Sequence, residues 1–402
     1  MIPRLIRTAA AATVIAALTA LGGCSGSGNK QPTQKEVAVA KWNNARASVM
    51  LSLANDQFKT GNYDKARQTL TEARKMSPDN PAIWVLSGKL NIEQGQLEVA
   101  ERELQKAVEL APTAAEPHYL LGVIYQRWQR FDSALNEYQS ASDKAPAELA
   151  YVLARAETLM VMDRPKDALA LLMEKLAFFD NNPVIRDAAG QLLMQQQRYD
   201  EAVTVFREAT LLATDDVTLK ERLAKALFYD KRYREAGDLL SRVASAEGNE
   251  KRADLQVMIG ECALQTQRVS EAKAAFELAT QLNPSSVPGW QGIAKAALTR
   301  SDLPRADLAI RRAISLEPAD AQSQLLLGYV RLRQDRLNDA MVAFRKASAL
   351  EATDPVSLCM TGYVLEKLGQ PQQAIEFYAR ALRVKPDDEL ANQLMAGVGM
   401  NE

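Results

Sequence analysis

The chain has 402 residues, of which 47% are hydrophobic, and its 49 basic residues nearly balance 50 acidic ones. A formal net charge of −1 excludes the strong positive field that would attract nucleic acid or an anionic membrane surface, so we predict neither as a direct partner. With one histidine, three cysteines and no C-x-x-C or H-E-x-x-H motif, the sequence gives no basis for a metal or cofactor site, and we predict none.

The first residues have the three-part pattern of a secretory signal. Arg4 and Arg7 are followed by an uncharged, alanine-rich run over residues 8–21, and small residues then lead to Cys24. This run is too short to span a bilayer comfortably. The ending Leu-Gly-Gly-Cys resembles the signal of bacterial lipoproteins. The alternative is an ordinary secretory signal with an incidental cysteine.

The lipoprotein resemblance implies that residues 1–23 are a signal peptide that is removed, and that Cys24 carries the lipid. Residues 24–33 are rich in small polar residues, which favours a flexible tether. Ser25 stands where an aspartate often directs retention in the inner membrane, so the resemblance implies an outer-membrane lipoprotein that faces the periplasm.

A long helix is predicted after the tether. Thr33 is followed three residues later by Glu36, which is the spacing of a capping box and a helix start signal. Because no helix-breaking residue occurs before Gly61, the sequence predicts one extended helix over residues 34–60.

One pattern of small, large apolar and proline residues then recurs along the chain. Its ten anchor residues lie 34 residues apart, except for one interval of 36. An alanine follows every anchor at +12, a large apolar residue follows at +16, and +19 is alanine except at Lys175 and Val243. Numbered as repeats 1 to 10, the anchors are Ala54, Gly88, Gly122, Ala156, Gly190, Ala224, Gly260, Ala294, Gly328 and Gly362.

This spacing predicts a pair of packed helices in each repeat. The residues at +12, +16 and +19 share one face of a helix because they are three, four and seven positions apart. Two antiparallel helices approach closely where both present small side chains, so we predict that each anchor packs against the +12 alanine of its repeat. Prolines fall only near the predicted helix starts and just after the second helix, where they are tolerated.

A 34-residue helix–turn–helix unit with these small residues and a closing proline resembles the tetratricopeptide repeat. The resemblance implies an all-α, right-handed superhelical solenoid of ten units over residues 34–386, and residues 387–402 are similar to a first helix that caps the C-terminal end. Two residues are inserted between Ala224 and Gly260, so residues 245–254 are predicted to form an irregular joint.

The resemblance also implies where partners bind. In this family the first helices line a concave face, and ligand contacts lie at offsets −3, +1, +4 and +5 from the anchor. These positions mix aromatic, apolar and charged residues, which suits an extended peptide or a partner helix. The alternative is that most of them are solvated or half-buried scaffold residues. The candidate residues are Leu51, Asn55, Lys59, Val85, Lys89, Glu93, Tyr119, Val123, Gln126, Arg127, Gln191, Lys225, Tyr229, Tyr329, Arg333, Tyr363 and Lys367.

Other chemically notable residues are interpreted as structural. His118 occupies a position held by tryptophan in two other repeats, which favours packing over catalysis. The basic cluster around Arg305 alternates with acidic residues and is interpreted as a solvated face. Cys262 and Cys359 lie three repeats apart, too far for a disulfide, so both are predicted to be free, buried thiols.

No segment outside the array is long enough for a catalytic domain, so we predict that the chain is not an enzyme. The two resemblances together imply a lipid-anchored periplasmic scaffold for protein–protein interactions in cell-envelope assembly, such as secretin or pilus machinery or related outer-membrane systems. The alternative is an accessory or regulatory subunit of polysaccharide export, or of an envelope enzyme that acts in trans.

Overall fold

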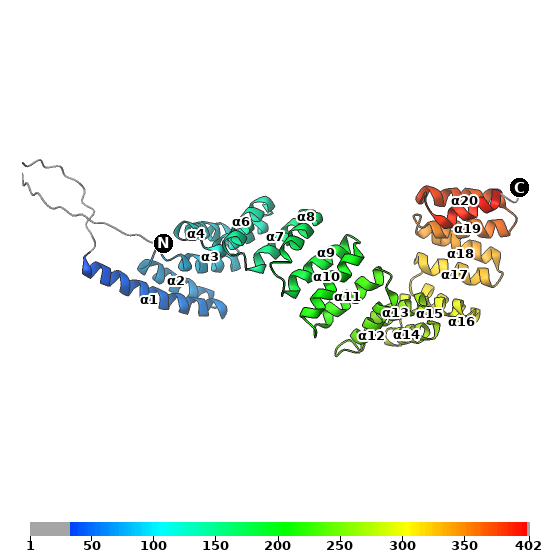
Figure 1. Cartoon of the computed structure of the whole chain (residues 1–402), viewed down its shortest axis with the longest axis horizontal. Helices are drawn as coiled ribbons and strands as arrows, with labels where there is room; N and C mark the ends of the chain where they lie inside the picture. The colour runs from blue at the N-terminus through cyan, green and yellow to red at the C-terminus, as the bar shows by residue number, and fades with distance from the viewer. Residues whose placement is uncertain (1–32, 400–402) are drawn as a thin grey trace, which may run out of the picture. The chain divides into compact units, whose positions relative to one another are not determined.

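The computed structural model describes residues 33–399, and Figure 1 shows their arrangement into helices. The predicted signal peptide over residues 1–23, Cys24 and all of the tether except Thr33 lie outside the described residues. The chain forms two compact units, Met1–Pro112 and Thr113–Glu402. Residues 33–399 contain 21 α-helices and no strands. None of these helices combines the length and the apolar character needed to cross a bilayer.

The first unit contains the helices of repeats 1 and 2. Thr33 caps the first helix: its hydroxyl accepts from the amide of Glu36, and the Glu36 carboxylate accepts from the amide of Thr33 at 2.7 Å. The predicted capping box is therefore confirmed, and the predicted long helix ends one residue early, at Lys59. The helices of this unit are α1 (Gln34–Lys59), α2 (Tyr63–Met76), α3 (Pro81–Glu93) and α4 (Leu97–Leu110).

The second unit contains the remaining eight repeats and one further helix, α21, which packs against α19 and α20. Proline begins several helices, as at Pro165 and Pro183. An amide hydrogen at the first position of a helix has no hydrogen-bond partner within the helix, so proline, which lacks one, is tolerated there. The helices of this unit are α5 (Ala115–Arg127), α6 (Phe131–Lys144), α7 (Leu149–Val161), α8 (Pro165–Lys175), α9 (Pro183–Gln195), α10 (Tyr199–Leu212), α11 (Val217–Tyr229), α12 (Tyr233–Ala244), α13 (Ala253–Gln265), α14 (Val269–Leu282), α15 (Val287–Thr299), α16 (Leu303–Leu316), α17 (Ala321–Arg333), α18 (Leu337–Leu350), α19 (Pro355–Lys367), α20 (Pro371–Val384) and α21 (Glu389–Gly399).

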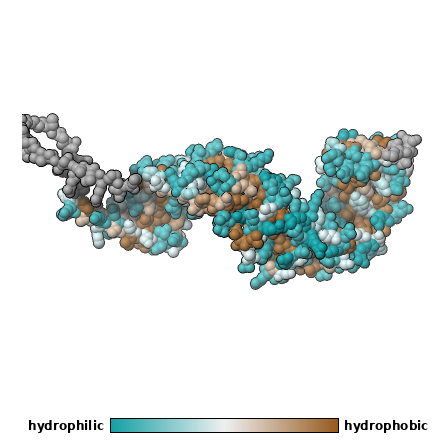
Figure 2. Space-filling model, in the orientation of Figure 1, coloured by the Kyte–Doolittle hydropathy of each residue, from teal (hydrophilic) through white to brown (hydrophobic). Residues whose placement is uncertain are grey.

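The predicted all-α array of ten helix pairs with a terminal helix is confirmed. The +12 alanine and the +16 residue of each pair form the centre of its core: all ten alanines are fully buried, and no +16 side chain is more than 1% exposed. Burial of a large apolar side chain contributes about 1.5–3 kcal/mol, so these residues supply much of the stability of each repeat. On the visible face of Figure 2, hydrophilic residues cover most of the described surface and apolar residues gather in patches.

For the six glycine anchors, the predicted partner was wrong. A Cβ atom on Gly122 would lie 2.5 Å from a ring carbon of Tyr138, and one on Gly328 would lie 2.4 Å from the ring of Phe344. The anchor glycine therefore makes room for the large +16 side chain, and the +12 alanine is not its nearest neighbour. All six glycine anchors show this contact.

The identity of the anchor follows the shape of the +16 residue. Five of the six glycine anchors face an aromatic ring, and the sixth faces Leu104. The four alanine anchors occur in repeats whose +16 residue is aliphatic, namely Leu70, Leu172, Leu240 and Ile310. A flat ring takes the space of the missing methyl group in five repeats, and four repeats combine an alanine anchor with an aliphatic side chain. These nine pairs keep a similar packed volume. The exception is Gly88, where a Cβ would lie 2.7 Å from the aliphatic Leu104.

The turn between the two helices of each repeat contains a residue in the left-handed region. This residue stands at +7 from the anchor and is glycine in three repeats only, at Gly61, Gly95 and Gly369. The other seven repeats place a residue with a side chain there at a φ between 56° and 63°. That conformation costs a non-glycine residue about 1–2 kcal/mol. The seven non-glycine residues are Gln129, Asp163, Gln197, Lys231, Gln267, Ser301 and Asp335.

Two junctions between repeats are longer than the rest. Most second helices are followed by a four-residue connection, whereas α12 and α13 are joined by residues 245–252, and α8 and α9 by residues 176–182. The first long junction lies within the predicted irregular joint, and the second was not predicted. Lys175 stands directly before the junction at 176–182, and Val243 stands two residues before the junction at 245–252. These two exceptions to alanine at +19 would have indicated both junctions.

The first helices of successive repeats lie closer together than the second helices. In the second unit α7 contacts α9, α13 contacts α15, and α15 contacts α17, and in the first unit α1 contacts α3. No pair of successive second helices within residues 33–399 makes contacts of comparable extent. The first helices therefore form the more tightly spaced layer, which places the −3, +1 and +5 residues of neighbouring repeats near one another.

Candidate partner-binding surface

The most accessible candidate residues lie at +5, which is the last residue of every first helix. All ten +5 residues are exposed, and each side chain projects from the end of its helix. Gln191, at +1, is also exposed. The +5 residues among the candidates are Lys59, Glu93, Arg127, Tyr229, Arg333 and Lys367.

The candidates at −3 and +1 are less accessible. Val85 is 8% exposed and belongs to the core, so it lies outside the candidate surface. The others present part of their side chain to solvent and part to a neighbouring helix, which gives the surface a fixed, partly apolar floor. These half-buried residues are Leu51, Asn55, Lys89, Tyr119, Val123, Lys225, Tyr329 and Tyr363.

Gln126 serves the core of its repeat. Its Oε1 accepts a hydrogen bond of 2.7 Å from the buried hydroxyl of Tyr138. Glu366 does the same for Tyr378 at 3.2 Å, and burial raises the pKa of both tyrosines. The other eight repeats have an apolar residue at +4 and no tyrosine at +16. The +4 position is therefore a packing position, and it holds a polar residue only where a buried tyrosine hydroxyl needs an acceptor. Gln126 consequently lies outside the candidate surface.

Aromatic candidates are held by other rings. The ring of Tyr329 meets Phe344 edge to face with centroids 5.4 Å apart, and burial raises the pKa of its hydroxyl. The ring centroid of Tyr119 lies 5.0 Å from that of Tyr151. These two tyrosines therefore offer a partner only their outer edges, and their positions are fixed before binding.

Tyr229 differs from these rings because it is half exposed. It is 51% accessible and stacks on Tyr199 with centroids 5.4 Å apart and planes 22° apart. A stacked, accessible pair of rings is a suitable contact for an apolar or proline-containing segment of a partner. Sequence reasoning missed Tyr199 because it begins a second helix, at +9 from its anchor.

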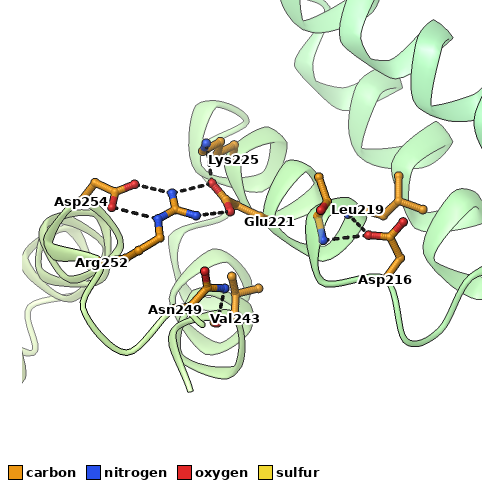
Figure 3. A network of polar contacts seen from close by, with 9 residues as sticks. Asp216, Leu219, Glu221, Lys225, Val243, Asn249, Arg252 and Asp254 are labelled. Carbon is orange, nitrogen blue, oxygen red and sulfur yellow. Dashed lines mark hydrogen bonds and ion pairs between the residues drawn. The ribbon is translucent and has the colours of Figure 1, made fainter. Parts of the chain in front are cut away.

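A network of ionic contacts joins the first helix of repeat 6 to the long junction that follows it (Figure 3). Arg252 places both terminal nitrogens on Glu221, at 2.7 and 3.0 Å, and also contacts Asp254. Lys225 binds the same Glu221 carboxylate at 2.7 Å. These hydrogen bonds, the one from Arg252 foremost, lower the pKa of Glu221. The bidentate contact fastens the inserted residues to α11 and leaves Lys225 only partly available to a partner.

Similar polar contacts cross between other neighbouring repeats. Lys295 reaches Glu261 at 2.8 Å, and both stand at +1 in their repeats, 34 residues apart. Arg222 pairs with Asp187, which also accepts a hydrogen bond of 3.1 Å from Gln191. Opposite charges 34 or 35 residues apart are a signal that could have been read from the sequence. These pairs hold the first helices in register and reduce the number of charges that are open to a partner.

The residues interpreted as structural keep that role. His118 binds Glu137 through Nδ1 at 2.7 Å, and its side chain is 14% exposed. Arg305 pairs with Glu277, which supports the solvated-face interpretation. Within residues 33–399 no cluster of three or more acidic, histidine or cysteine side chains could hold a metal ion.

The prediction of free, buried thiols is confirmed for both cysteines of the array. Burial is the main cause that raises the pKa of Cys262 to about 12 and that of Cys359 to about 11. A thiol at these values is almost entirely protonated near neutral pH, so neither sulfur is a nucleophile under those conditions.

Comparison with known families agrees with the repeat geometry. Two family models described as tetratricopeptide repeat match residues 57–124 and residues 186–216. A third model, described as the C-terminal domain of cilia and flagella-associated protein 70, matches residues 219–401. The chain is a tetratricopeptide repeat protein.

Known relatives match parts of this tetratricopeptide repeat protein. The E3 ubiquitin-protein ligase CHIP of Arabidopsis thaliana is 28% identical over 22% of the chain and 32% of its own length. The BBSome complex member BBS4 of Bos taurus is 21% identical over 55% of the chain and 42% of its own length. The TPR repeat-containing protein PA4667 of Pseudomonas aeruginosa is 41% identical over 13% of the chain and 9% of its own length. The chain thus spans less than half of each of these relatives.

Among solved structures, yeast Tom70 aligns over 89% of both chains with a TM-score of 0.49 and 12% sequence identity. A chain from the APC/C heterotetramer Cut9–Hcn1 aligns over 88% of this protein and 96% of its own length, with a TM-score of 0.47 and 14% identity.

Proposed function

We propose that this tetratricopeptide repeat protein is a lipid-anchored scaffold on the periplasmic side of the outer membrane, where it binds protein partners during assembly of the cell envelope. Secretin, pilus or related outer-membrane machinery supplies partners of the right kind. The repeats provide a protein-binding surface, and the proposed lipid on Cys24 holds that surface at the membrane.

The observation that carries the proposal is a lipoprotein-like signal placed directly before a repeat array. Two arginines, a short apolar run and Leu-Gly-Gly-Cys precede a small polar tether and then the capping box at Thr33. Only a short tether separates the proposed lipid from α1. The array is therefore expected to stay close to the membrane surface while its exposed +5 residues face partners.

Lipidation is tested by labelling cells with a palmitate analogue. We expect the analogue to label the wild-type protein and to leave the Cys24→Ala variant unlabelled. Ser25→Ala serves as the matched control, because it alters the neighbouring residue and keeps the thiol. Equal labelling of wild type and Cys24→Ala would overturn the anchored form of the proposal.

The class of partner is tested by cross-linking in the native envelope. Recovery of secretin, pilus or outer-membrane assembly proteins would support the assembly role, and the yield should fall for a Tyr229→Ala, Arg333→Ala double variant that alters two exposed candidates. Recovery of polysaccharide-export proteins or envelope enzymes instead would replace it with the accessory role. A purified protein that turns over a substrate would overturn both.

A further inference from the structure

Repeat 4 carries an arginine at a position that is uncharged in every other repeat. Arg155 stands at −1 from its anchor, on α7, where the nine other repeats have leucine, isoleucine, alanine, serine or threonine. Several of these residues are almost fully buried, as Leu121 is at 3% and Leu223 at 7%. The residues at −1 in the nine other repeats therefore show what this position normally holds, and all nine side chains are uncharged.

The guanidinium of Arg155 has no hydrogen-bond or ion-pair partner among the residues that the structure describes. Its Nε is buried and lacks a hydrogen bond, and no acidic side chain within residues 33–399 forms an ion pair with it. The two acids that attract it at longer range are engaged elsewhere, because Asp143 accepts from Gln139 at 2.5 Å and Glu174 binds Lys175 at 2.9 Å. Burial lowers the pKa of Arg155, as expected for a cation that has lost water without gaining a counter-charge.

Arg155 lines a cavity of about 350 Å³ that is formed by residues of α6, α7 and α8. Leu135 comes from α6, Leu159 from α7 and Leu171 from α8, so aliphatic side chains form part of the cavity wall and charged ones form the rest. Arg164 and Asp167 also line the cavity, but they neutralise each other at 2.7 Å. Glu174 also lines the cavity and binds Lys175, so Arg155 is the one charged lining residue without an ion pair among residues 33–399.

Repeat 8 contains the same groove without the charge. Its cavity of about 620 Å³ is lined from the same repeat offsets, −1, +8, +11, +14 and +15. Ile293 takes the place of Arg155, and the one arginine in that cavity, Arg305, is paired with Glu277. The scaffold thus accepts an apolar residue at −1 of this groove, and repeat folding does not require the charge.

Arg155 is half-buried, and a charge that loses part of its hydration without gaining a partner costs stability, whereas an apolar residue in its place is often neutral or stabilising. A partner that supplies the missing counter-charge removes that cost at the moment of binding. We propose that the groove of repeat 4 binds an acidic side chain of a partner protein, with its carboxylate on Arg155 and a neighbouring apolar residue between α6 and α8. This inference rests on the proposed function, because it specifies the chemistry of a protein partner.

The surroundings favour a carboxylate over a phosphate group. Asp167 and Glu174 both line the cavity, so a dianion would meet two negative charges and only one free positive charge. A monoanionic carboxylate matches the single planar guanidinium, which can hold it through two parallel hydrogen bonds.

The proposal is tested with a matched pair of probe peptides on the full-length protein in a mild detergent. Ligand-detected NMR measures binding of acetyl-Leu-Glu-Leu-amide and of acetyl-Leu-Gln-Leu-amide. We expect the glutamyl peptide to bind on the order of tenfold more tightly, because only it forms a charge-assisted pair. Arg155→Gln should abolish this difference, and the control Ile293→Val should preserve it.

Stability provides the second readout. Arg155→Ile copies the groove of repeat 8, so the midpoint of thermal unfolding should stay within about 2 °C of wild type or rise, while the preference for the glutamyl peptide disappears. Loss of folding in Arg155→Ile would identify the arginine as structural and overturn the proposal. Equal binding of the two peptides, absence of binding, or tighter binding of inorganic phosphate than of acetate would also overturn it.

Failure of this inference is separable from failure of the proposed function. If Arg155→Gln is acylated and cross-links to its envelope partners as wild type does, the scaffold role stands and the groove is not its acidic-residue site. If the glutamyl peptide binds at Arg155 while Cys24 carries no lipid, the proposed acidic-residue site is supported and the proposed lipid anchor is overturned.

Discussion

Repeats 6 and 9 fill the contact between their two helices with different pairs of residues. In repeat 9 the ring of Phe344 lies against Gly328, and in repeat 6 the corresponding residues Ala224 and Leu240 belong to one core cluster. Phe344, Ala224 and Leu240 are fully buried. The two pairs reach similar packing in different ways, so the packing at this position depends on the pair and not on either residue alone.

The largest expected effect comes from removing the ring. Phe344→Ala should cost about 3–5 kcal/mol, because it deletes a buried aromatic side chain and leaves a cavity beside a glycine that cannot fill it. Hydrogen exchange should show lost protection in repeats 8 to 10 and near-native protection in repeats 4 and 5, since stability in repeat arrays is local. Uniform loss of protection along the chain would contradict this expectation.

The pairing of anchor and +16 residue is tested by giving repeat 6 the glycine anchor and the phenylalanine at +16 that repeat 9 has. Leu240→Phe should cost about 1–3 kcal/mol, because the ring meets the methyl group of Ala224. Adding Ala224→Gly should recover part of this loss although glycine alone costs about 1 kcal/mol in a helix.

A double-mutant cycle in urea measures the coupling between the two sites, which should reach about 1 kcal/mol or more. Gly328→Ala in repeat 9 is the converse variant, and Phe344→Leu should rescue it. Additive effects in both cycles would show that the correlation between anchor and +16 residue has no energetic basis.

Tyr329 and Tyr229 allow a packed aromatic side chain to be compared with a half-exposed one. Tyr329→Ala should cost roughly 1–3 kcal/mol, since the ring packs edge to face on Phe344. Tyr229→Ala, the control at a half-exposed position, should change stability by no more than about 0.5 kcal/mol. Urea unfolding of both variants measures the two changes in stability. Equal changes would show that the ring of Tyr329 does not contribute to the packed core.

The smallest effect concerns the turns. Gln267 adopts a φ of 60° at the position where repeat 10 has Gly369. Gln267→Gly should stabilise repeat 7 by about 1 kcal/mol or less, because relief of the left-handed strain is offset in part by the greater freedom of glycine in the unfolded chain. Gln265→Gly, two residues earlier at the end of α13, should destabilise instead. A loss of stability in Gln267→Gly would show that the side chain makes a contact that outweighs the strain.

The sequence predicted the helices well because its signals are periodic and local. The capping box at Thr33 and the +12 alanines are readable without coordinates, and they place 21 helices. The candidate surface was less predictable. Val85 and Gln126 stand at −3 and +4, offsets that the resemblance assigns to partner contacts, yet one is buried and the other binds the hydroxyl of Tyr138. An offset fixes the direction of a side chain, and the neighbouring helix decides what that side chain meets.

The sequence alone determined the period, the all-α repeat architecture, the burial of the cysteines and the N-terminal pattern on which the proposed anchor rests. Only the tertiary structure decided that the glycine anchors face the +16 side chains, that a second long junction lies at residues 176–182, and that Arg155 lines a cavity with no ion-pair partner among residues 33–399. The reason is that helix formation and amphipathic faces depend on residues three or four positions apart. Packing partners and missing counter-charges instead depend on residues that only folding brings together.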